Sequence, residues 1–412
     1  MALNFVWIAF FVIAFAIALI KLIFFGDTQI FKTLVDGMFE AAKGSVMDVA
    51  FPLAGTMVFF LGLMNIAEKA GAINWLARIL NPFMKRLFPE VPDGHPAMGQ
   101  MVMNFSANML GLDNAATPFG LKAMESLQSL NPSKDTATHA QIMFLVLHTS
   151  GLTVIPLSII SYRIAAGSVE PASIFIPCVL ATICTTLASI LIVSIRQKLS
   201  WDRVLLGWIA GLIAAVFFIL LFVNSLPALD KEVFSKVTGN LILFVIVVLI
   251  ILGGVWKKIA VFDAFIEGAK NGFDVVLKII PYLVGMLVAI RVFRDSGALL
   301  YLVDGLSYVI GLTGINSDFT GALPVAIMKP FSGSGARGLM LDIFANPAYG
   351  PDSFVGKLAS TFQGSADTTF YIIALYFGSV GIRKVRYAIW AGILADLIGV
   401  VCAIIIGYIF FA

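Results

Sequence analysis

The sequence predicts an all-α polytopic membrane protein built from two inverted repeats, with re-entrant hairpins and broken transmembrane helices. Hydrophobic residues make up 60% of the 412 residues, charged residues make up only 12%, and the mean hydropathy is +0.98. This proportion of charged residues is too small for the surface of a water-soluble protein. The chain must therefore lie in lipid. Lipid cannot satisfy exposed backbone groups, and the long apolar runs lack the alternation of barrel strands, which leaves helices.

The apolar segments fall into two kinds. Uninterrupted runs long enough to cross the hydrocarbon, about 20 residues, are 2–25, 171–195, 204–224, 236–255 and 387–411. The first run lacks the basic start of a signal peptide, so we expect it to be a retained helix. Other segments are interrupted by Pro, Gly, Ser, Thr or a charge, or are too polar to face lipid: 47–66, 97–130, 139–162, 275–293, 319–345 and 355–378. Non-helical backbone at that depth requires surrounding protein or a water-filled cavity.

The two halves of the chain share landmarks in the same order. Residues 39–44 match 265–270, 68–72 match 294–298, 105–108 match 331–334, and 148–153 match 363–368. We therefore expect a first repeat over 1–203, a linking transmembrane helix and loop over 204–235, and a second repeat over 236–412.

Basic residues in short loops indicate how the repeats are oriented. The loops 196–203, 257–258 and 383–386 would be cytoplasmic by the positive-inside rule. The loop 163–170 is equivalent to 383–386, yet counting spans places it on the opposite side, so the repeats would be inverted as in many secondary transporters. Arg163, Lys21 and Lys32 do not fit this topology.

The first candidate site is the polar segment between residues 104 and 117. Buried polar groups without partners cost a few kcal/mol, so such a density requires protein partners, water or a ligand. The alternative is a structural re-entrant loop in which Asp113 or Asn114 caps the next helix. The candidate binding residues are Asn104, Ser106, Asn108, Asp113, Asn114 and Thr117.

The second candidate site lies at 329–338, where Gly333, Gly335 and Gly338 match G-x-G-x-x-G. No strand or βαβ unit surrounds this motif, so a dinucleotide fold is not expected. A glycine- and serine-rich helix start between two cations would suit an anion. The alternative is that the cations pair with Asp342 or Asp367. The candidate residues are Lys329, Ser332, Ser334 and Arg337.

The third candidate site is the matched pair of interrupted spans. Asp367 is an ionisable residue inside a span, which makes it a functional candidate by default. His148 is either a hydrogen-bonded packing residue or shares a polar task with Gln363, its match in the second half. The candidates are His148, Thr149, Ser150 and Thr153 in the first half, and Gln363, Ser365, Asp367, Thr368 and Thr369 in the second.

Several classes of protein are not expected. No catalytic motif or metal-ligand spacing appears, so we predict neither an enzyme nor a metal or other cofactor. The basic residues are scattered, which does not favour a nucleic-acid partner. Cys178, Cys184 and Cys402 lie within predicted spans as small core residues. Gly207 and Gly211 form a GxxxG face, which indicates close helix packing, either within the subunit or across a homodimer.

Two parts of the chain resemble known families. The run NFSANMLGLDNAATPFGLKAM at 104–124 closely resembles the spore maturation protein A family. The runs KPFSGSGAR at 329–337 and QGSADTT at 363–369 resemble the spore maturation protein B family, so the chain looks like a fusion of the two. Both belong to the nucleoside recognition, or Gate, domain group, whose name is shared with modules of concentrative nucleoside transporters and of the B-type ferrous iron transporter. The resemblance implies a multi-pass protein of the bacterial inner membrane.

The sequence therefore supports two hypotheses of function. The first is a transporter or permease that moves a small polar solute, anionic or nucleoside-like, through a site near the bilayer midplane between the repeats. Its coupling ion would be Na⁺ or H⁺. The second is a non-transporting envelope or spore-maturation component that binds a partner or a lipid-linked precursor.

Overall fold

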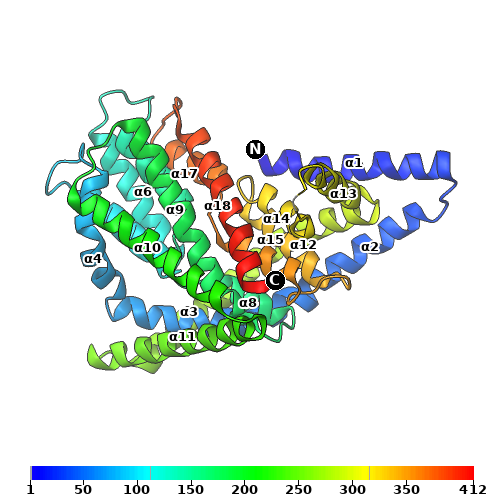
Figure 1. Cartoon of the computed structure of the whole chain (residues 1–412), viewed down its shortest axis with the longest axis horizontal. Helices are drawn as coiled ribbons and strands as arrows, with labels where there is room; N and C mark the ends of the chain where they lie inside the picture. The colour runs from blue at the N-terminus through cyan, green and yellow to red at the C-terminus, as the bar shows by residue number, and fades with distance from the viewer. Residues whose placement is uncertain (1, 112, 315) are drawn as a thin grey trace.

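The computed structural model describes residues 2–111, 113–314 and 316–412, and these residues form helices and loops without a strand (Figure 1). Within them, seven helical segments are long and apolar enough to cross a membrane. These segments are Trp7–Phe25, Ile30–Lys69, Pro171–Gln197, Arg203–Ser225, Val233–Trp256, Val261–Asp295 and Ala388–Phe411. The prediction of an all-α polytopic membrane protein is confirmed.

The helices of the two halves occur in the same order. The first half contains α1 (Ala2–Phe25), α2 (Ile30–Gly44), the π-helical turn Ser45–Ala50, α3 (Phe51–Lys69), α4 (Ala72–Leu87), α5 (Pro96–Met109), α6 (Asp113–Ser129), α7 (His139–Thr149), α8 (Leu157–Ala165), the 3₁₀ turn Pro171–Ile174 and α9 (Phe175–Gln197). After α10 (Arg203–Ser225), the second half contains α11 (Ala228–Trp256), α12 (Val261–Asp295), α13 (Ala298–Gly311), the 3₁₀ turn Asp318–Ala322, α14 (Leu323–Met328), α15 (Gly333–Ala345), α16 (Phe354–Gly364), α17 (Thr369–Ser379) and α18 (Ala388–Phe411). By length and order, α1 corresponds to α11, and α2 together with α3 corresponds to α12. The helices α4–α9 then correspond one by one, in the same order, to the helices α13–α18.

The segments that the sequence marked as interrupted divide into two groups. The breaks expected in 139–162 and 355–378 are present, between α7 and α8 and between α16 and α17. In 47–66 the α-helix is interrupted by the π-helical turn Ser45–Ala50, just before Pro52, but the helical segment Ile30–Lys69 continues through it. In 275–293 the expected interruption is absent, because α12 continues through Pro281. Both helices are shielded by each other, which allows such irregularities within one continuous helix.

The matched helices α3 and α12 pack against each other in opposite directions. Gly272 of α12 lies against Val58, and Gly268 lies against Leu61 and Asn65, so residue numbers rise along α3 as they fall along α12. The Asn65 amide donates to the Ala264 carbonyl at 2.6 Å. Two equivalent helices that run antiparallel are related by a two-fold axis perpendicular to both. The orientation of that axis in the bilayer stays a prediction.

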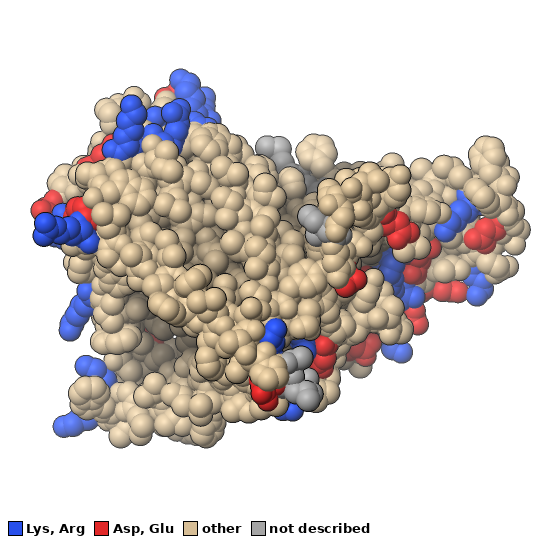
Figure 2. All heavy atoms as spheres, in the orientation of Figure 1, with Lys and Arg blue, Asp and Glu red and all other residues tan. Residues whose placement is uncertain are grey.

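The matched helices α9 and α18 form a second antiparallel pair. Thr185 in the middle of α9 contacts Gly399 in α18. At one end, Gln197 of α9 donates to the hydroxyl of Tyr387, just before α18 begins, at 2.8 Å. Both helices lie beside α10 in Figure 1. Figure 2 shows Lys and Arg gathered at the upper left of the molecule, the end at which α9 finishes and α18 begins.

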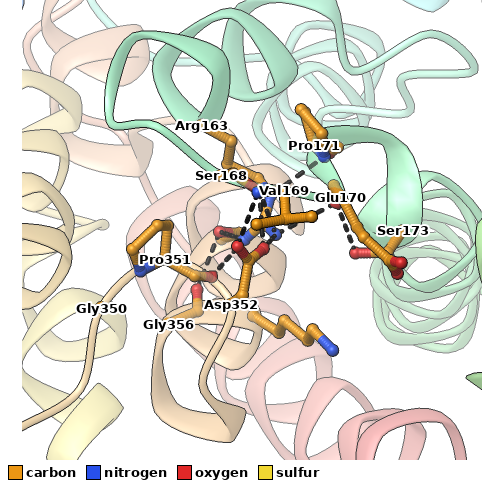
Figure 3. A network of polar contacts seen from close by, with 12 residues as sticks. Arg163, Ser168, Val169, Glu170, Pro171, Ser173, Gly350, Pro351, Asp352 and Gly356 are labelled. Atoms are coloured by element: carbon orange, nitrogen blue, oxygen red, sulfur yellow. Dashed lines mark hydrogen bonds and ion pairs between the residues drawn. The ribbon is translucent and has the colours of Figure 1, made fainter.

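A loop of each half meets a loop of the other at both ends of this helix pair. At one end, Lys384 forms an ion pair with Asp135 at 2.9 Å, and both side chains are mostly exposed. At the other end, the fully buried Arg163 binds Asp352 at 2.8 Å (Figure 3). The remaining partners of the Arg163 guanidinium are the carbonyls of Glu170, Pro171 and Pro351 and the hydroxyls of Ser168 and Ser360. We call these contacts the Asp135 clasp and the Arg163 clasp.

Candidate functional site

Polar residues from both halves line one cavity of about 330 Å³. Its walls come from α3, α8, α12 and α15 and from the breaks after α7 and α16. This volume lies at the lower end of the range for small-molecule sites, about 300–1,000 Å³. The predicted site residues that line it are Asn108, Thr153, Lys329, Arg337, Gln363, Asp367 and Thr368.

The two helix breaks touch at this cavity. The backbone N–H of Asp367 donates to the carbonyl of Thr149 at 2.8 Å. Gly151 has a φ of +59°, and a Cβ at this position would lie 2.8 Å from the Asp367 nitrogen. A side chain there would therefore force the two breaks apart. The matched interrupted spans thus cross at their unwound residues, which places their polar groups side by side.

His148 lies directly behind the cavity and is buried. Its Nδ1 is 2.9 Å from Oδ1 of Asn104 and 3.1 Å from Nδ2 of Asn108, both on α5. The His148 Nε2 faces the Asp367 carboxylate at 3.9 Å. The Asp367 side chain is 44% exposed and lines the cavity. Asn104 also donates to the Ala116 carbonyl at 2.7 Å, which ties α5 to α6. These contacts orient the His148 ring toward Asp367.

The two predicted cations, Lys329 and Arg337, both line the cavity. Arg337 donates from Nη1 to the Tyr162 hydroxyl at 3.0 Å, and its guanidinium lies 5.0 Å from the centre of that ring. Asp342 is paired with Arg294 of α12. Lys329, at the end of α14, lines the cavity and is partly buried. The cavity therefore carries positive groups from α14 and α15 opposite the carboxylate of Asp367.

The glycine-rich motif at the start of α15 is explained mainly by packing. Ser332 caps the helix, because its Oγ accepts from the Gly335 N–H at 2.9 Å, and the Ser334 hydroxyl is 3.1 Å from Ser332 Oγ. A Cβ at Gly335 would lie 3.2 Å from Met286, and one at Gly338 would lie 2.8 Å from Ile290. These glycines let α15 approach α12 closely. Neither serine lines the cavity.

The remaining predicted residues are not brought to the cavity wall. Buried hydroxyls bond back to carbonyls of their own segment: Ser106 to Val102, Thr149 to Val146, Ser150 to Leu147, and Ser365 to Phe362. Thr369 donates to Asp396, and Thr117 is exposed on α6. The side chains of Asp113 and Asn114 lie outside the described residues, and their capping or binding role stays a prediction.

Some polar groups of the site were missed by the sequence reasoning. Asn65 and Glu68 of α3, Tyr162 of α8 and Asn271 of α12 also line the cavity. Asp396 of α18 lies behind it and is 7% exposed. The signal was present for Asp396, because it is an acid within the apolar run 387–411, and the rule that singled out Asp367 applies to it equally.

The fold and the cavity define a polytopic membrane protein in which segments from both halves of the chain line a polar site. The sequence matches the Gate family, described as nucleoside recognition, over residues 50–168 and 276–383, and the chain belongs to this family. Different parts of the chain are similar to two proteins of Bacillus subtilis (strain 168). Spore maturation protein B is 49% identical over 162 residues, which cover 39% of this chain and 88% of that protein. Spore maturation protein A is 38% identical over 189 residues, which cover 46% of this chain and 92% of that protein. A fusion of the two types is thereby supported.

Proposed function

We propose that this protein is a transporter of the bacterial inner membrane that moves a small polar solute, anionic or nucleoside-like. One observation carries the proposal: polar segments that are far apart in the sequence converge on a single cavity where the two helix breaks cross. Discontinuous helices of this kind typically form the substrate sites of secondary transporters. The antiparallel packing of α3 and α12 would let one half move against the other.

The chemistry of the cavity suits a solute that carries both charge and hydrogen-bonding groups. Lys329 and Arg337 would bind an anionic group, and the Asp367 carboxylate would accept hydrogen bonds from hydroxyl or amino groups. The amides of Asn108 and Gln363 can donate and accept in the same space. The Oε1 atom of Gln363 is buried and has no hydrogen-bond partner among the described residues, so a donor on the solute would satisfy it.

The names of the two relatives favour a second candidate function. Both are called spore maturation proteins, so this chain would act as an envelope or spore-maturation component that binds a partner or a lipid-linked precursor through the same cavity. Under this alternative, purified protein in sealed vesicles would bind a ligand but would move no solute across the membrane.

The test compares Asp367→Asn with the wild type. Purified protein is screened for thermal stabilisation by nucleosides and by small anionic metabolites, and solutes that stabilise it are tested for uptake into proteoliposomes. Losing a hydrogen bond to a charged group costs about 1.5–3 kcal/mol, so we expect binding to fall by about 10- to 150-fold with the fold intact. Asp230→Asn, at an exposed position of α11, is the control. An Asp367→Asn protein with full binding and uptake would contradict the proposal.

A further inference from the structure

Asp396 is a buried acid in the membrane-crossing helix α18 whose carboxylate is only half satisfied. Its Oδ2 accepts from the Thr369 hydroxyl at 2.6 Å. Its Oδ1 is buried and has no hydrogen-bond partner among the described residues. An ionised carboxylate requires donors at both oxygens, and a charge at bilayer depth is costly. An ionised Asp396 is therefore poorly satisfied, so a small change in its surroundings would determine whether it binds a proton.

The position of Asp396 connects it to the cavity. Thr369 is the first residue of α17, directly after the break that carries Asp367 and Thr368, and both of these residues line the cavity. A movement of the break would therefore change the only hydrogen bond that the described residues give to Asp396. Because of this link, solute binding and the proton on Asp396 can influence each other.

The titratable groups around the break are Lys329 and Asp367, which line the cavity, and His148 of α7, which faces Asp367 at 3.9 Å. The other helices around α18 present hydroxyls near this level: Thr149 of α7 lies close to Gly392, and Thr185 of α9 contacts Gly399.

The helices that pack against α18 carry further titratable groups, among them His139 of α7, Arg196 of α9, and Tyr371 and Tyr376 of α17. Cys184 of α9 meets Cys402, and Lys357 of α16 lies over the ring of Phe411. The charged residue of α10 is Arg203, at the start of that helix, and those of α11 lie between 230 and 236. Among the described residues, the Thr369 hydroxyl is the one group that is hydrogen-bonded to the Asp396 carboxylate.

We infer that Asp396 is the proton-binding site of this protein and that H⁺, not Na⁺, is its coupling ion, an inference that rests on the proposed transport function. When the solute binds at the break and displaces Thr369, the Asp396 carboxylate loses the one donor that the described residues give it. The carboxylate then takes up one proton from a hydronium ion that enters the cavity from one side of the membrane, and it becomes a neutral acid while water remains. Release of the solute reverses the step and returns the proton. Solute and proton would thus move together, and the proton offsets the negative charge of the solute.

The proton site can be tested without knowing the solute. Infrared difference spectra of the full-length protein, recorded between acid and alkaline pH, report the C=O stretch of a neutral carboxylic acid. We expect the wild type to show a titrating band at higher frequency than the bands of the exposed, hydrated acids, and we expect Asp396→Asn to lack it. Asp342→Asn should keep the band, because Asp342 is similarly buried but is held by Arg294. If Asp396→Asn fails to fold, Thr369→Val should still shift the band, because it removes the hydrogen bond to the carboxyl group.

Two results would overturn the inference: a band that persists in Asp396→Asn, or a band that does not titrate with pH. Uptake measurements separate this inference from the transport proposal. If a proton gradient drives accumulation in the wild type, Asp396→Asn should lose accumulation and only equilibrate the solute. Accumulation driven by Na⁺ and unchanged in this variant would reject the proton site while transport stands. A titrating Asp396 in a protein that moves no solute would reject transport while the proton site stands.

Discussion

The Arg163 clasp should contribute far more to stability than the Asp135 clasp at the other end of the α9–α18 pair. Arg163 is fully buried, and each of its guanidinium nitrogens has a protein acceptor (Figure 3). Asp352 supplies the countercharge, and its side chain is 33% exposed. In the other clasp, the side chains of Lys384 and Asp135 are 69% and 51% exposed. The two contacts join equivalent loops, so each serves as the control for the other.

The size of the effect follows from burial. Removing one partner of a buried ion pair costs about 3–5 kcal/mol, which is the loss that we expect for Arg163→Met. Asp352→Asn keeps one acceptor oxygen and leaves a partly hydrated site, so its cost should be about 1.5–3 kcal/mol, the range for a hydrogen bond to a charged group. For Asp135→Asn we expect about 0–1 kcal/mol, the range for an exposed pair. Unfolding in detergent, followed by the fluorescence of the six tryptophans, measures all three.

The pH dependence gives a second readout for the same clasp. Burial opposes ionisation of Asp352, but hydrogen bonds from Ser168 and from the Val169 N–H, together with the Arg163 charge, hold its pKa below the ordinary value of 3.8. A lowered pKa in the folded state means that the stabilisation is fully present above that ordinary value. It is lost as the pH falls through the lowered value. The difference between the wild type and Asp352→Asn should therefore vanish only in strong acid. Equal losses in Asp352→Asn and Asp135→Asn at neutral pH would refute this reasoning.

Two further predictions concern the crossing of the breaks and the orientation of the chain. Gly151→Ala should lower the unfolding temperature more than Gly26→Ala. Both positions have a positive φ, which costs about 1–2 kcal/mol for residues other than glycine. Of the two, only Gly151 also lies against the Asp367 backbone. Equal losses of unfolding temperature in the two variants would show that the contact between Gly151 and Asp367 is unimportant. In a background without native cysteines, Lys134→Cys and Val169→Cys should react with a membrane-impermeant maleimide from opposite sides. Labelling of both cysteines from the same side would contradict the predicted inverted orientation of the two repeats.

Much of the fold could be predicted because lipid imposes strict rules on helices. The uninterrupted runs correspond closely to α1, α9, α10, α11 and α18, since length and hydropathy alone determine such helices. The continuity of α12 could not be predicted, because the effect of Pro281 depends on the packing around it. Likewise, the GxxxG face of α10 has no atom within 4 Å of a Cβ at Gly207 or Gly211 among the described residues. That face is not used by the described part of this chain, and the homodimer stays a prediction.

The candidate site was predicted in its location and less well in its members. Polar density inside apolar sequence correctly indicated which segments meet, because stranded polar groups at bilayer depth must find partners. It could not separate Asp367, which lines the cavity, from Ser106 and Ser150, whose hydroxyls bond back to their own helix. That difference depends on helix rotation. Asn271 of α12 was missed because a single polar residue in a long span carries little signal by itself.

Arg163 shows why a charge that contradicts a topology need not overturn it. The positive-inside rule describes basic residues that remain in water beside the membrane. Arg163 is fully buried and bound to Asp352, so it presents no net charge at its end of the molecule. Lys32, which also fitted poorly, is paired with Asp36 at 3.0 Å. With the charges of Arg163 and Lys32 paired locally, the exposed basic residues of the loops 196–203 and 383–386 lie at the opposite end and still predict that this end is cytoplasmic.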